Sequence, residues 1–452
     1  MRQNYWFQLP NILIITSLLL AGCLTKSTIP EQPANVNLHP TITNPPPDQE
    51  KQPTVEATET PDSLVIWARY DLSDTSFAPG VFLKQFLDQF EADTGIEVIY
   101  EQVAWDKISQ KLAIAAQSGG DVPDIVEIRG QQVQALRDIG ALLDLTELVG
   151  SYPWVDRLND ADTRGCMVNG IRYCVALNYS GGSWYYNVAD YPDGWPQSTE
   201  EFEIQAERLK AEGKYAATFF AGNHNSATEM TWAPMFYSNG GSIFDEEGKP
   251  NWASPQNVEV IEWMRSMLVK GYIPETCFTG DFTAGETPFV DGKAAAVRGG
   301  SWSYLYIPGL KEKYEANQTE IAGGFAFNSG KPYIFLNSLG WGVPAGAENP
   351  AAAIKFIDAF LSDEQVLAEW ASNWYAIPSI DDALKNNQLE NEFYVETAKV
   401  IKENGIFMQQ SPYYQESLSR LTEALQTVML YPDTDIMEEL LVAQQEIINK
   451  YW

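Results

Sequence analysis

The sequence predicts an α/β fold, with a mostly parallel, doubly wound sheet in a chain divided into two domains. After residue 62, short apolar segments with strand character alternate with segments of helical periodicity. Such alternation requires crossover connections between parallel strands. The chain has 452 residues, and a single hydrophobic core stops growing beyond roughly 250 to 300 residues. Two domains are therefore the expected organisation.

The first expected elements are a buried strand over 64–67 and an amphipathic helix that ends at Gly95. In the helical segment Phe82, Phe86 and Phe90 recur at intervals of four residues, which places their rings on one helix face. A glycine directly after the last periodic residue is a common helix stop. Further strands are expected over 96–100 and 123–128, and further helices from about 108, 131, 199, 255 and 436.

Polar and aromatic side chains follow two of the expected strands. In open α/β sheets, ligands bind outside the carboxyl ends of the strands. The residues at these ends are candidate ligand contacts: Trp67, Arg69, Tyr70, Asp71, Arg129, Gln131 and Gln132. The alternatives are a core position for Trp67 and surface ion pairs for the two arginines.

The amino terminus resembles a bacterial lipoprotein signal. A short apolar run ends in the sequence LAGC at residues 20–23. The run is too short to span a bilayer comfortably, and the small residues at its end suit a signal peptide. The similarity to a lipobox implies a signal peptide over 1–22 and lipid attachment at Cys23. Residues 23–61 are rich in Pro and Thr and predict a flexible tether between the anchor and the fold. An uncleaved membrane anchor is the alternative.

Charge and histidine content exclude several functions. The formal net charge is −32, so the chain lacks the basic surface that nucleic-acid backbones require. It has only two histidines, and His39 lies in the tether. His224 is the one imidazole available to the folded region, and we interpret it as a loop residue. These counts therefore exclude a multi-histidine metal site and a nucleic-acid partner, and a Ser/His triad or a histidine general base would have to use His224. We also expect no catalytic residues, no metal site and no cofactor.

The favoured disulfide joins Cys166 and Cys174. These residues flank Asn169-Gly170, a strong signal for a tight hairpin turn, and export makes a disulfide plausible. Cys277 would then be unpaired. Three cysteines allow other pairings, which the sequence leaves open.

The order of these segments is similar to that of the type 1 extracellular solute-binding proteins of ABC importers, the group that includes maltodextrin-binding proteins. The segments that carry the resemblance are LVIW at 64–67, PDIV at 123–126, YYN at 185–187, NGGSIF at 239–244, FVDGKAAA at 289–296, GGSW at 299–302 and GWGVP at 340–344.

The resemblance implies a periplasmic-binding-protein-like fold of two hinged lobes around a ligand cleft. One lobe would combine 62–178 with 341–395, and the other would combine 179–340 with 396–452, including the hinge segments. Gly181-Gly182 would lie at the first crossing between the lobes. The family cleft adds four aromatic candidates to those at the strand ends: Trp232, Trp302, Tyr413 and Tyr414. The sequence departs from the maltodextrin pattern at Ser180, where an acidic residue is expected.

The function implied by the resemblance is capture of a neutral solute, with a mono- or oligosaccharide favoured, and delivery to the transmembrane permease of an ABC importer. Aromatic rings suit the apolar faces of a sugar, and planar polar side chains suit its hydroxyls. The protein would be lipid-anchored at the extracytoplasmic face of the cell envelope and would not be an enzyme. The alternatives are a non-sugar solute, such as a peptide, a polyamine or glycerol phosphate, and an extracellular glycoside hydrolase.

Overall fold

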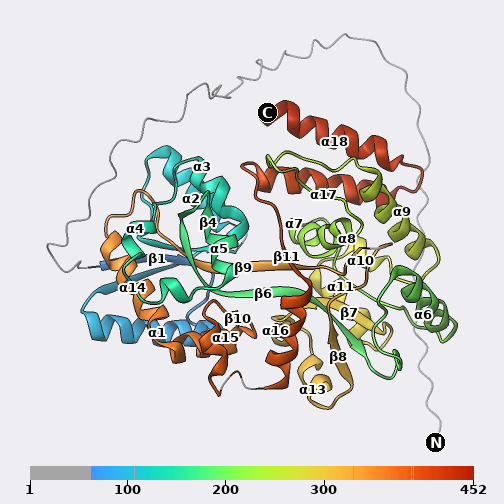
Figure 1. The fold of residues 1–452 in the computed structure, drawn as a ribbon, viewed down its shortest axis with the longest axis horizontal. Helices are drawn as coiled ribbons and strands as arrows, with labels where there is room; N and C mark the ends of the chain where they lie inside the picture. Colours follow the sequence, from blue (N-terminus) through green and yellow to red (C-terminus); the bar gives the residue numbers. More distant parts are fainter. Residues whose placement is uncertain (1–62, 106, 329, 388, 390) are drawn as a thin grey trace, which may run out of the picture. The chain divides into compact units, whose positions relative to one another are not determined.

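Two long strands, β6 (Cys174–Asn187) and β9 (Ile334–Gly342), run through the middle of the fold. The computed structural model describes residues 63–105, 107–328, 330–387, 389 and 391–452. The predicted signal peptide, Cys23 and the tether lie outside these residues. In Figure 1, β6 and β9 connect the half that contains β1 and α1 with the half that contains α6 and α9.

The main sheet has the strand order β10-β6-β9-β3-β1-β2. Strands β1 (Ser63–Ala68), β2 (Glu97–Gln102) and β3 (Ile125–Arg129) are parallel, as predicted. Strand β9 is antiparallel to both β3 and β6, so the sheet is mixed, and the prediction of a mostly parallel sheet is right for the first three strands and for β11 (Gly405–Phe407) beside β9. The difference arises because β6 and β9 run in opposite directions beside each other.

Strand β6 changes its pairing partners at Gly181-Gly182. Up to Gly181 it pairs with β9, with Gly181 opposite Leu336. From Gly182 onward it pairs with β7 (Ala296–Gly300), with Gly182 opposite Gly300, and then also with β8 (Thr319–Ala322). One continuous strand therefore belongs to two sets of strand pairs, at the point where the sequence places the first crossing.

The helices match the predicted ones closely where glycine, proline or a capping side chain marks their ends. Helix α1 runs over Ala78–Thr94, with proline in its first turn and Gly95 as a left-handed C-cap at φ 71°. Helix α6 (Thr199–Ala211) is capped by the Ser198 side chain, which is a common N-cap. The other helices of the first half and its return segments are α2 (Ile108–Ser118), η1 (Gly130–Gln132), α3 (Val133–Asp138), α4 (Thr146–Val149), η2 (Val155–Arg157), α5 (Asp160–Cys166), α14 (Pro350–Leu361), α15 (Glu364–Trp374), η4 (Asp381–Lys385) and α16 (Glu392–Asn404).

The remaining helices surround the second half of β6, and two short strands lie beside β6 and β9. They are α7 (Asn225–Ala227), the π-helix η3 (Thr228–Trp232), α8 (Ala233–Ser238), α9 (Pro255–Val269), α10 (Thr276–Thr279), α11 (Phe282–Val290), α12 (Ser303–Tyr306), α13 (Leu310–Glu315), α17 (Tyr414–Leu430) and α18 (Ile436–Tyr451), with the short strands β10 (Ile377–Pro378) and β11 (Gly405–Phe407) beside β6 and β9. Within the described residues, none of these helices combines the length and the apolar character that a membrane span requires.

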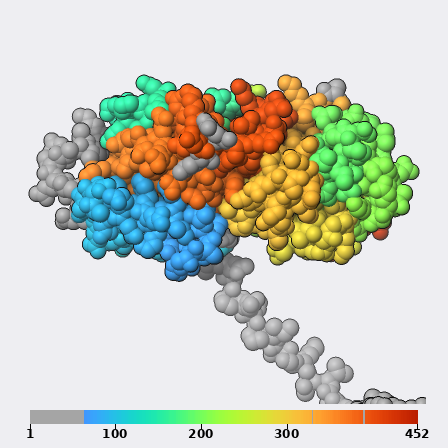
Figure 2. Space-filling model, turned by 90° about the horizontal axis from the view of Figure 1, so that it is seen from below, coloured from blue at the N-terminus to red at the C-terminus, as the bar shows by residue number. Residues whose placement is uncertain are grey.

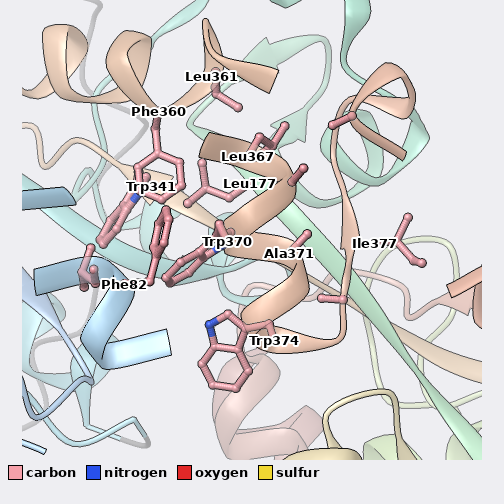
Figure 3. Packing of buried hydrophobic residues seen from close by; sticks show 14 of the residues in the cluster. Phe82, Leu177, Trp341, Phe360, Leu361, Leu367, Trp370, Ala371, Trp374 and Ile377 are labelled. Atoms are coloured by element: carbon pink, nitrogen blue, oxygen red, sulfur yellow. The ribbon is translucent and has the colours of Figure 1, made fainter. Parts of the chain in front are cut away.

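The largest apolar cluster packs α1, α14 and α15 against the sheet. Phe82, Phe360 and Trp370 meet edge to face or tilted, with ring centroids 5.5 to 6.1 Å apart, in arrangements that aromatic pairs prefer. Figure 3 shows these rings pointing toward one another. The Trp370 indole N–H donates to Asn178 Oδ1 on β6 at 3.0 Å. This contact ties α15 to the strand that continues into the other half.

A second cluster lies around Trp184 and Trp195, whose ring centroids are 5.1 Å apart. It includes buried residues of α6, α8, α9, α17 and α18. In Figure 2, the blue N-terminal segment and the orange segment near residue 350 share one half of the surface, while green and yellow segments between about 200 and 300 form the other. Each half therefore draws on segments that are far apart in the sequence.

The Cys166–Cys174 hairpin forms as the sequence predicts. Strands β4 (Met167–Val168) and β5 (Ile171–Arg172) pair across Asn169 and Gly170, at φ 53° and 81°, which suits the positive-φ turn of a two-residue hairpin. The two cysteines form a disulfide. Cys277 is free and fully buried, and burial raises the pKa of its thiol to about 12.

Gly340 on β9 is fixed by the close approach of β6. A Cβ atom at this position would lie 2.0 Å from the carbonyl oxygen of Val175 and 2.8 Å from Cα of Ala176. Backbone atoms cannot rotate away, so we predict that Gly340→Ala lowers the free energy of unfolding by about 3 kcal/mol or more. Urea unfolding followed by tryptophan fluorescence measures this change.

Gly342→Ala is the matched control on the same strand. Its Cβ would meet only the Leu142 side chain, at 3.4 Å, and more distant atoms, so the expected loss is below about 1 kcal/mol. Equal losses in the two variants would show that the approach of β6 does not constrain Gly340.

Candidate solute-binding site

A cavity of about 360 Å³ lies at the carboxyl ends of β1 and β2. This volume is within the usual range for small-molecule sites. Nine residues line it: Arg69, Tyr70, Asp71, Asp74, Phe77, Gln102, Trp105, Tyr306 and Trp374. Eight of them come from the half that contains β1. Tyr306 comes from the end of α12, after β7, and therefore brings the second half of the fold to the same cavity.

Arg69 is held between two tryptophan rings. Its guanidinium carbon lies 4.0 Å from the ring centroid of Trp105 and 4.3 Å from that of Trp374. Such contacts attract a cation to the ring face. Glu127 balances the charge, with an oxygen 3.4 Å from Arg69 Nε. The planar donor is therefore fixed in position at the wall of the cavity.

Tyr70 supports this arrangement from inside the core. Its hydroxyl donates to Glu127 Oε1 at 2.6 Å, and burial raises the pKa of Tyr70 well above its ordinary value. The hydroxyl therefore stays protonated and remains a donor. Asp71, by contrast, is exposed, and hydrogen bonds from Ser73 lower the pKa of its carboxyl group, so it presents an ionised carboxylate to the cavity.

A second ion pair connects the two halves. Arg129, at the end of β3, places Nη2 2.6 Å from Glu229 Oε2 on η3, and its guanidinium carbon lies 5.6 Å from the Trp105 ring centroid. The other oxygen of Glu229 accepts from the Tyr414 hydroxyl at 2.8 Å. Tyr414, Glu229, Arg129, Trp105 and Arg69 thus form a continuous series of contacts from α17 to the cavity.

The π-helix that carries Glu229 has a local cause. The amide of Ala233 donates to the carbonyl of Thr228, five residues earlier, and the next residue, Pro234, has no amide hydrogen to donate. A widened turn of this kind often occurs at functional sites. It places Glu229 on the inner side of the helix, where only 2% of its side chain is exposed.

The structure brings some of the predicted residues to this site. Arg69, Tyr70 and Asp71 line the cavity. Arg129 contacts the ring of Trp105, which also contacts Arg69. Tyr414 is linked to Arg129 through Glu229. The two arginines do form ion pairs, as the alternative reading proposed, but their partners are buried carboxylates.

Other predicted residues lie elsewhere. Trp67 points to the opposite face of the sheet from Ile66, where the Lys111 ammonium lies 3.6 Å from its ring centroid. Trp232 is buried against Phe236 and Phe278. Gln131 is buried and donates to the Leu336 carbonyl at 3.5 Å, and Gln132 is beside it in η1. Tyr413 stacks on Tyr451, with centroids 4.4 Å apart.

Trp302 occupies an intermediate position. It is partly buried and packs against both large apolar clusters. It does not line the cavity beside Arg69, but it lies where the two cores meet.

Sequence reasoning missed six lining residues: Asp74, Phe77, Gln102, Trp105, Tyr306 and Trp374. Gln102 and Trp105 follow a strand that was predicted, so the rule applied to β1 and β3 would have found them. Trp374 and Tyr306 have no local signal, because only the packing of α15 and α12 brings them to β1. Within the described residues, no cluster of acidic, histidine or cysteine side chains could hold a metal ion.

The family profile described as "Bacterial extracellular solute-binding protein" matches residues 85–397. The chain belongs to this family. Its members bind solutes rather than catalyse reactions, so the protein is a solute-binding protein of ABC transport and not an enzyme.

Two characterised relatives are distant. The diacetylchitobiose binding protein DasA of Streptomyces coelicolor is 23% identical over 316 residues, or 67% of this chain and 70% of that protein. An arabinooligosaccharide-binding protein of Halalkalibacterium halodurans is 22% identical over 257 residues, or 54% of this chain and 56% of that protein. This second alignment spans little more than half the length of the relative.

Solved structures share the fold. The GacH receptor of Streptomyces glaucescens has a TM-score of 0.71 and 16% identity, and the match covers 86% of this chain and 98% of the receptor. Maltose-bound MalE3 of T. maritima has a TM-score of 0.72 and 18% identity, with 85% and 99% covered. The predicted two-lobed α/β binding-protein fold is thereby confirmed.

The Arg129–Glu229 pair gives a stability prediction for the solute-binding protein. Removing one partner of a buried ion pair leaves a charge without compensation, at a cost of about 3 kcal/mol or more. We expect Arg129→Met to destabilise the protein by about that amount, and Arg129→Met combined with Glu229→Gln to recover at least half of the loss. Urea unfolding of the two single variants and the double variant measures both effects.

The same variants distinguish the interaction energy of the ion pair from the independent packing contribution of each side chain. If the double variant is as unstable as the sum of the single variants, Arg129 and Glu229 do not interact energetically. The surface pair Lys84 and Asp88 on α1, with both side chains more than half exposed, is the control, and its removal should cost less than about 0.5 kcal/mol.

Proposed function

We propose that this protein captures a carbohydrate, either a mono- or an oligosaccharide, between its two halves and delivers it to an ABC permease. The observation that carries the proposal is the cavity at Arg69, which is walled by aromatic rings and lined from both halves. Tyr306 is 52% exposed, so its ring is available to a ligand. The relatives whose names specify a ligand bind diacetylchitobiose or arabinooligosaccharides, which supports the same class of solute.

The charges around the cavity suit an uncharged sugar ring. Arg69 is compensated by Glu127, and Arg129 is compensated by Glu229. The guanidinium groups can still donate hydrogen bonds to hydroxyl oxygens, while attraction for a free anion is offset by the paired carboxylates. Gln102 and Asp71 offer further polar groups at the rim.

Closure around the solute is the proposed transport signal. Because Tyr306 and the residues on β1 belong to different halves, a bound solute contacts both only when the halves are close. A ligand that makes more contacts in the closed state shifts the population toward that state. We assign the lobes to 62–178 with 341–395 and to 179–340 with 396–452, and the movement to Gly181-Gly182.

The proposal also includes a membrane anchor and a protein partner. Cys23 would carry the lipid, and residues 24–61 would tether the folded part at the outer face of the membrane. The partner would be the transmembrane subunits of an importer, which would recognise the closed form.

A cationic solute such as a polyamine is the second candidate. Asp71 and Asp74 both line the cavity, and neither is within ion-pair distance of a basic residue in the described part of the chain. Two ionised carboxylates at the rim would attract a positively charged amine.

A thermal-shift panel tests both candidates. The panel contains diacetylchitobiose, arabinooligosaccharides, maltose and acarbose, with spermidine and a short peptide as non-sugar solutes. A ligand at about 100 times its Kd should stabilise the protein by about 2.7 kcal/mol. A rise in Tm with one or more of the carbohydrates supports the proposal, whereas a rise with spermidine alone would replace it with the polyamine function.

Variants of the cavity locate the binding. We predict that Trp105→Ala and Tyr306→Ala each weaken binding of the identified solute at least about tenfold, as measured by calorimetry, because each removes ring surface from the cavity worth about 1.4 kcal/mol or more. Tyr431→Ala, a 65% exposed tyrosine outside the cavity, is the control and should bind normally. An unchanged affinity in Trp105→Ala would remove the Arg69 cavity from the binding site, and an unchanged affinity in Tyr306→Ala would show that the second half does not contact the solute there.

A further inference from the structure

The Arg129–Glu229 ion pair joins the two halves in a buried position. Arg129 ends β3 in the first half, and Glu229 lies on η3 in the second half. The two charged groups are 2.6 Å apart, and their side chains are only 12% and 2% exposed. A neutral contact, from the Gln410 amide to the Arg164 carbonyl at 3.4 Å, also joins the halves. Hydrogen bonds between charged groups are roughly twice as strong as neutral ones, so the ion pair is the stronger of the two contacts.

Glu229 is held in place by its own half. The Tyr414 hydroxyl on α17 donates to Glu229 Oε1 at 2.8 Å, and the other oxygen, Oε2, faces Arg129. Burial raises the pKa of Tyr414 well above its ordinary value, with a further contribution from the charge of Glu229, so the hydroxyl keeps its proton and stays a donor. The orientation of the carboxylate therefore depends on η3 and α17, which both belong to the second half.

Neither member of the pair lines the Arg69 cavity. The link between the pair and the cavity is Trp105, whose ring centroid lies 5.6 Å from the guanidinium carbon of Arg129 and 4.0 Å from that of Arg69. A substitution of Glu229 keeps every ring and polar group that lines the cavity. Any effect of Glu229 on the affinity for a solute must therefore act through Arg129 and the position of the halves.

Closure places the charge of Arg129 where water has little access. A buried charge is costly when nothing compensates it, and Glu229 supplies the compensating charge in this structure. If the halves separate, the pair is broken and water solvates Arg129 instead. The carboxylate is therefore needed in the closed state and not in the open state, so its removal favours the open state.

We propose that Glu229 is a positioning residue for solute binding, whose carboxylate compensates Arg129 on closure and thereby determines the fraction of the protein that is closed. Glu229 does not contact the solute. This role rests on the proposed function, because it concerns the closure that surrounds a solute in the Arg69 cavity. The affinity for the solute then depends on a residue that lies outside the cavity.

A residue that acts only on closure changes affinity in a characteristic way. When a solute binds only the closed form, its apparent Kd is the intrinsic Kd divided by the closed fraction. Such a residue therefore changes the Kd of every solute by one common factor, which equals the change in the closed fraction of the solute-free protein. A residue that contacts the solute, as Tyr306 does in the proposed site, changes Kd by factors that differ between solutes.

Single-molecule energy transfer and calorimetry measure the two quantities. Donor and acceptor dyes at Lys84→Cys on α1 and Lys311→Cys on α13 give the closed fraction without solute, in the full chain with Cys23→Ser. Calorimetry gives Kd for two carbohydrates of different size. We expect Glu229→Gln to lower the closed fraction at least about fivefold and to raise both Kd values by the same factor, to within about twofold.

Glu203→Gln is the matched control within the second half. Glu203 also accepts a hydrogen bond from an aromatic side chain, the Trp263 indole at 2.8 Å, and it pairs with a cation, Lys270 Nζ at 2.8 Å. All three residues belong to the second half, so the same change of charge at Glu203 should leave both the closed fraction and Kd unchanged.

Tyr414→Phe is a second variant, which keeps the buried ring and removes only the hydroxyl that donates to Glu229. In the closed state it leaves one oxygen of a buried carboxylate without its donor. It should therefore lower the closed fraction by less than Glu229→Gln does, and Kd should again rise by the same factor. This variant decides the test if Glu229→Gln does not fold.

Two results would overturn the proposal. One is a closed fraction in Glu229→Gln equal to that of the parent chain and of Glu203→Gln. The other is a change in Kd that differs between the two solutes or from the change in the closed fraction. If no carbohydrate of the panel binds, the proposed function fails, whereas a closed fraction that falls in Glu229→Gln and not in Glu203→Gln still supports the role of Glu229 in closure.

Discussion

The structure depends on one strand that is shared between two sets of strand pairs. Strand β6 is paired with β9 up to Gly181 and with β7, and then also with β8, from Gly182 onward. Backbone hydrogen bonds hold each half of the strand firmly, and the two glycines between them have no side chains to resist a change in the angle. We propose that any movement of one half relative to the other is concentrated at this point and at the adjacent part of β9.

Two features connect the halves outside the strands. The Arg129–Glu229 pair joins the end of β3 to η3, and Tyr306 faces the cavity that β1 and β2 form. Both connections would be lost if the halves separated, and a buried ion pair is costly to break when one partner stays buried. The contacts that position the candidate site thus also hold the halves together, which is the coupling that a solute-triggered closure requires.

Much of the fold was predictable, and the reasons are local. Gly95 ends α1, Ser198 begins α6 and Asn169-Gly170 forms the tight turn before Cys174, because each depends on a few neighbouring residues. The direction of β9 was not predictable in this way, since it depends on pairing with strands more than a hundred residues away. The same difference between local signals and long-range packing separates the site residues that the sequence predicted from those that it missed.

Arg69, Tyr70 and Asp71 follow β1 and could be found from strand position alone. Trp374 and Tyr306 reach the cavity only through tertiary packing of α15 and α12, so no local pattern marks them. Trp67 shows the limit of the rule: alternation along β1 turns its ring toward α2, to the face opposite Ile66. A position at the end of a strand places a residue near the cavity, but the packing of other elements decides which side chains line it.

The most direct test of the account is the distance between the two halves with and without solute. Spin labels at Lys84→Cys on α1 and Lys311→Cys on α13 report it by pulsed electron resonance, in a chain with Cys23→Ser. The buried thiol of Cys277, with its raised pKa, should resist labelling. The account predicts a broad distance distribution without solute that narrows and shifts to shorter distances when the carbohydrate identified by thermal shift is added. A single distribution that is unchanged by a saturating solute would contradict it.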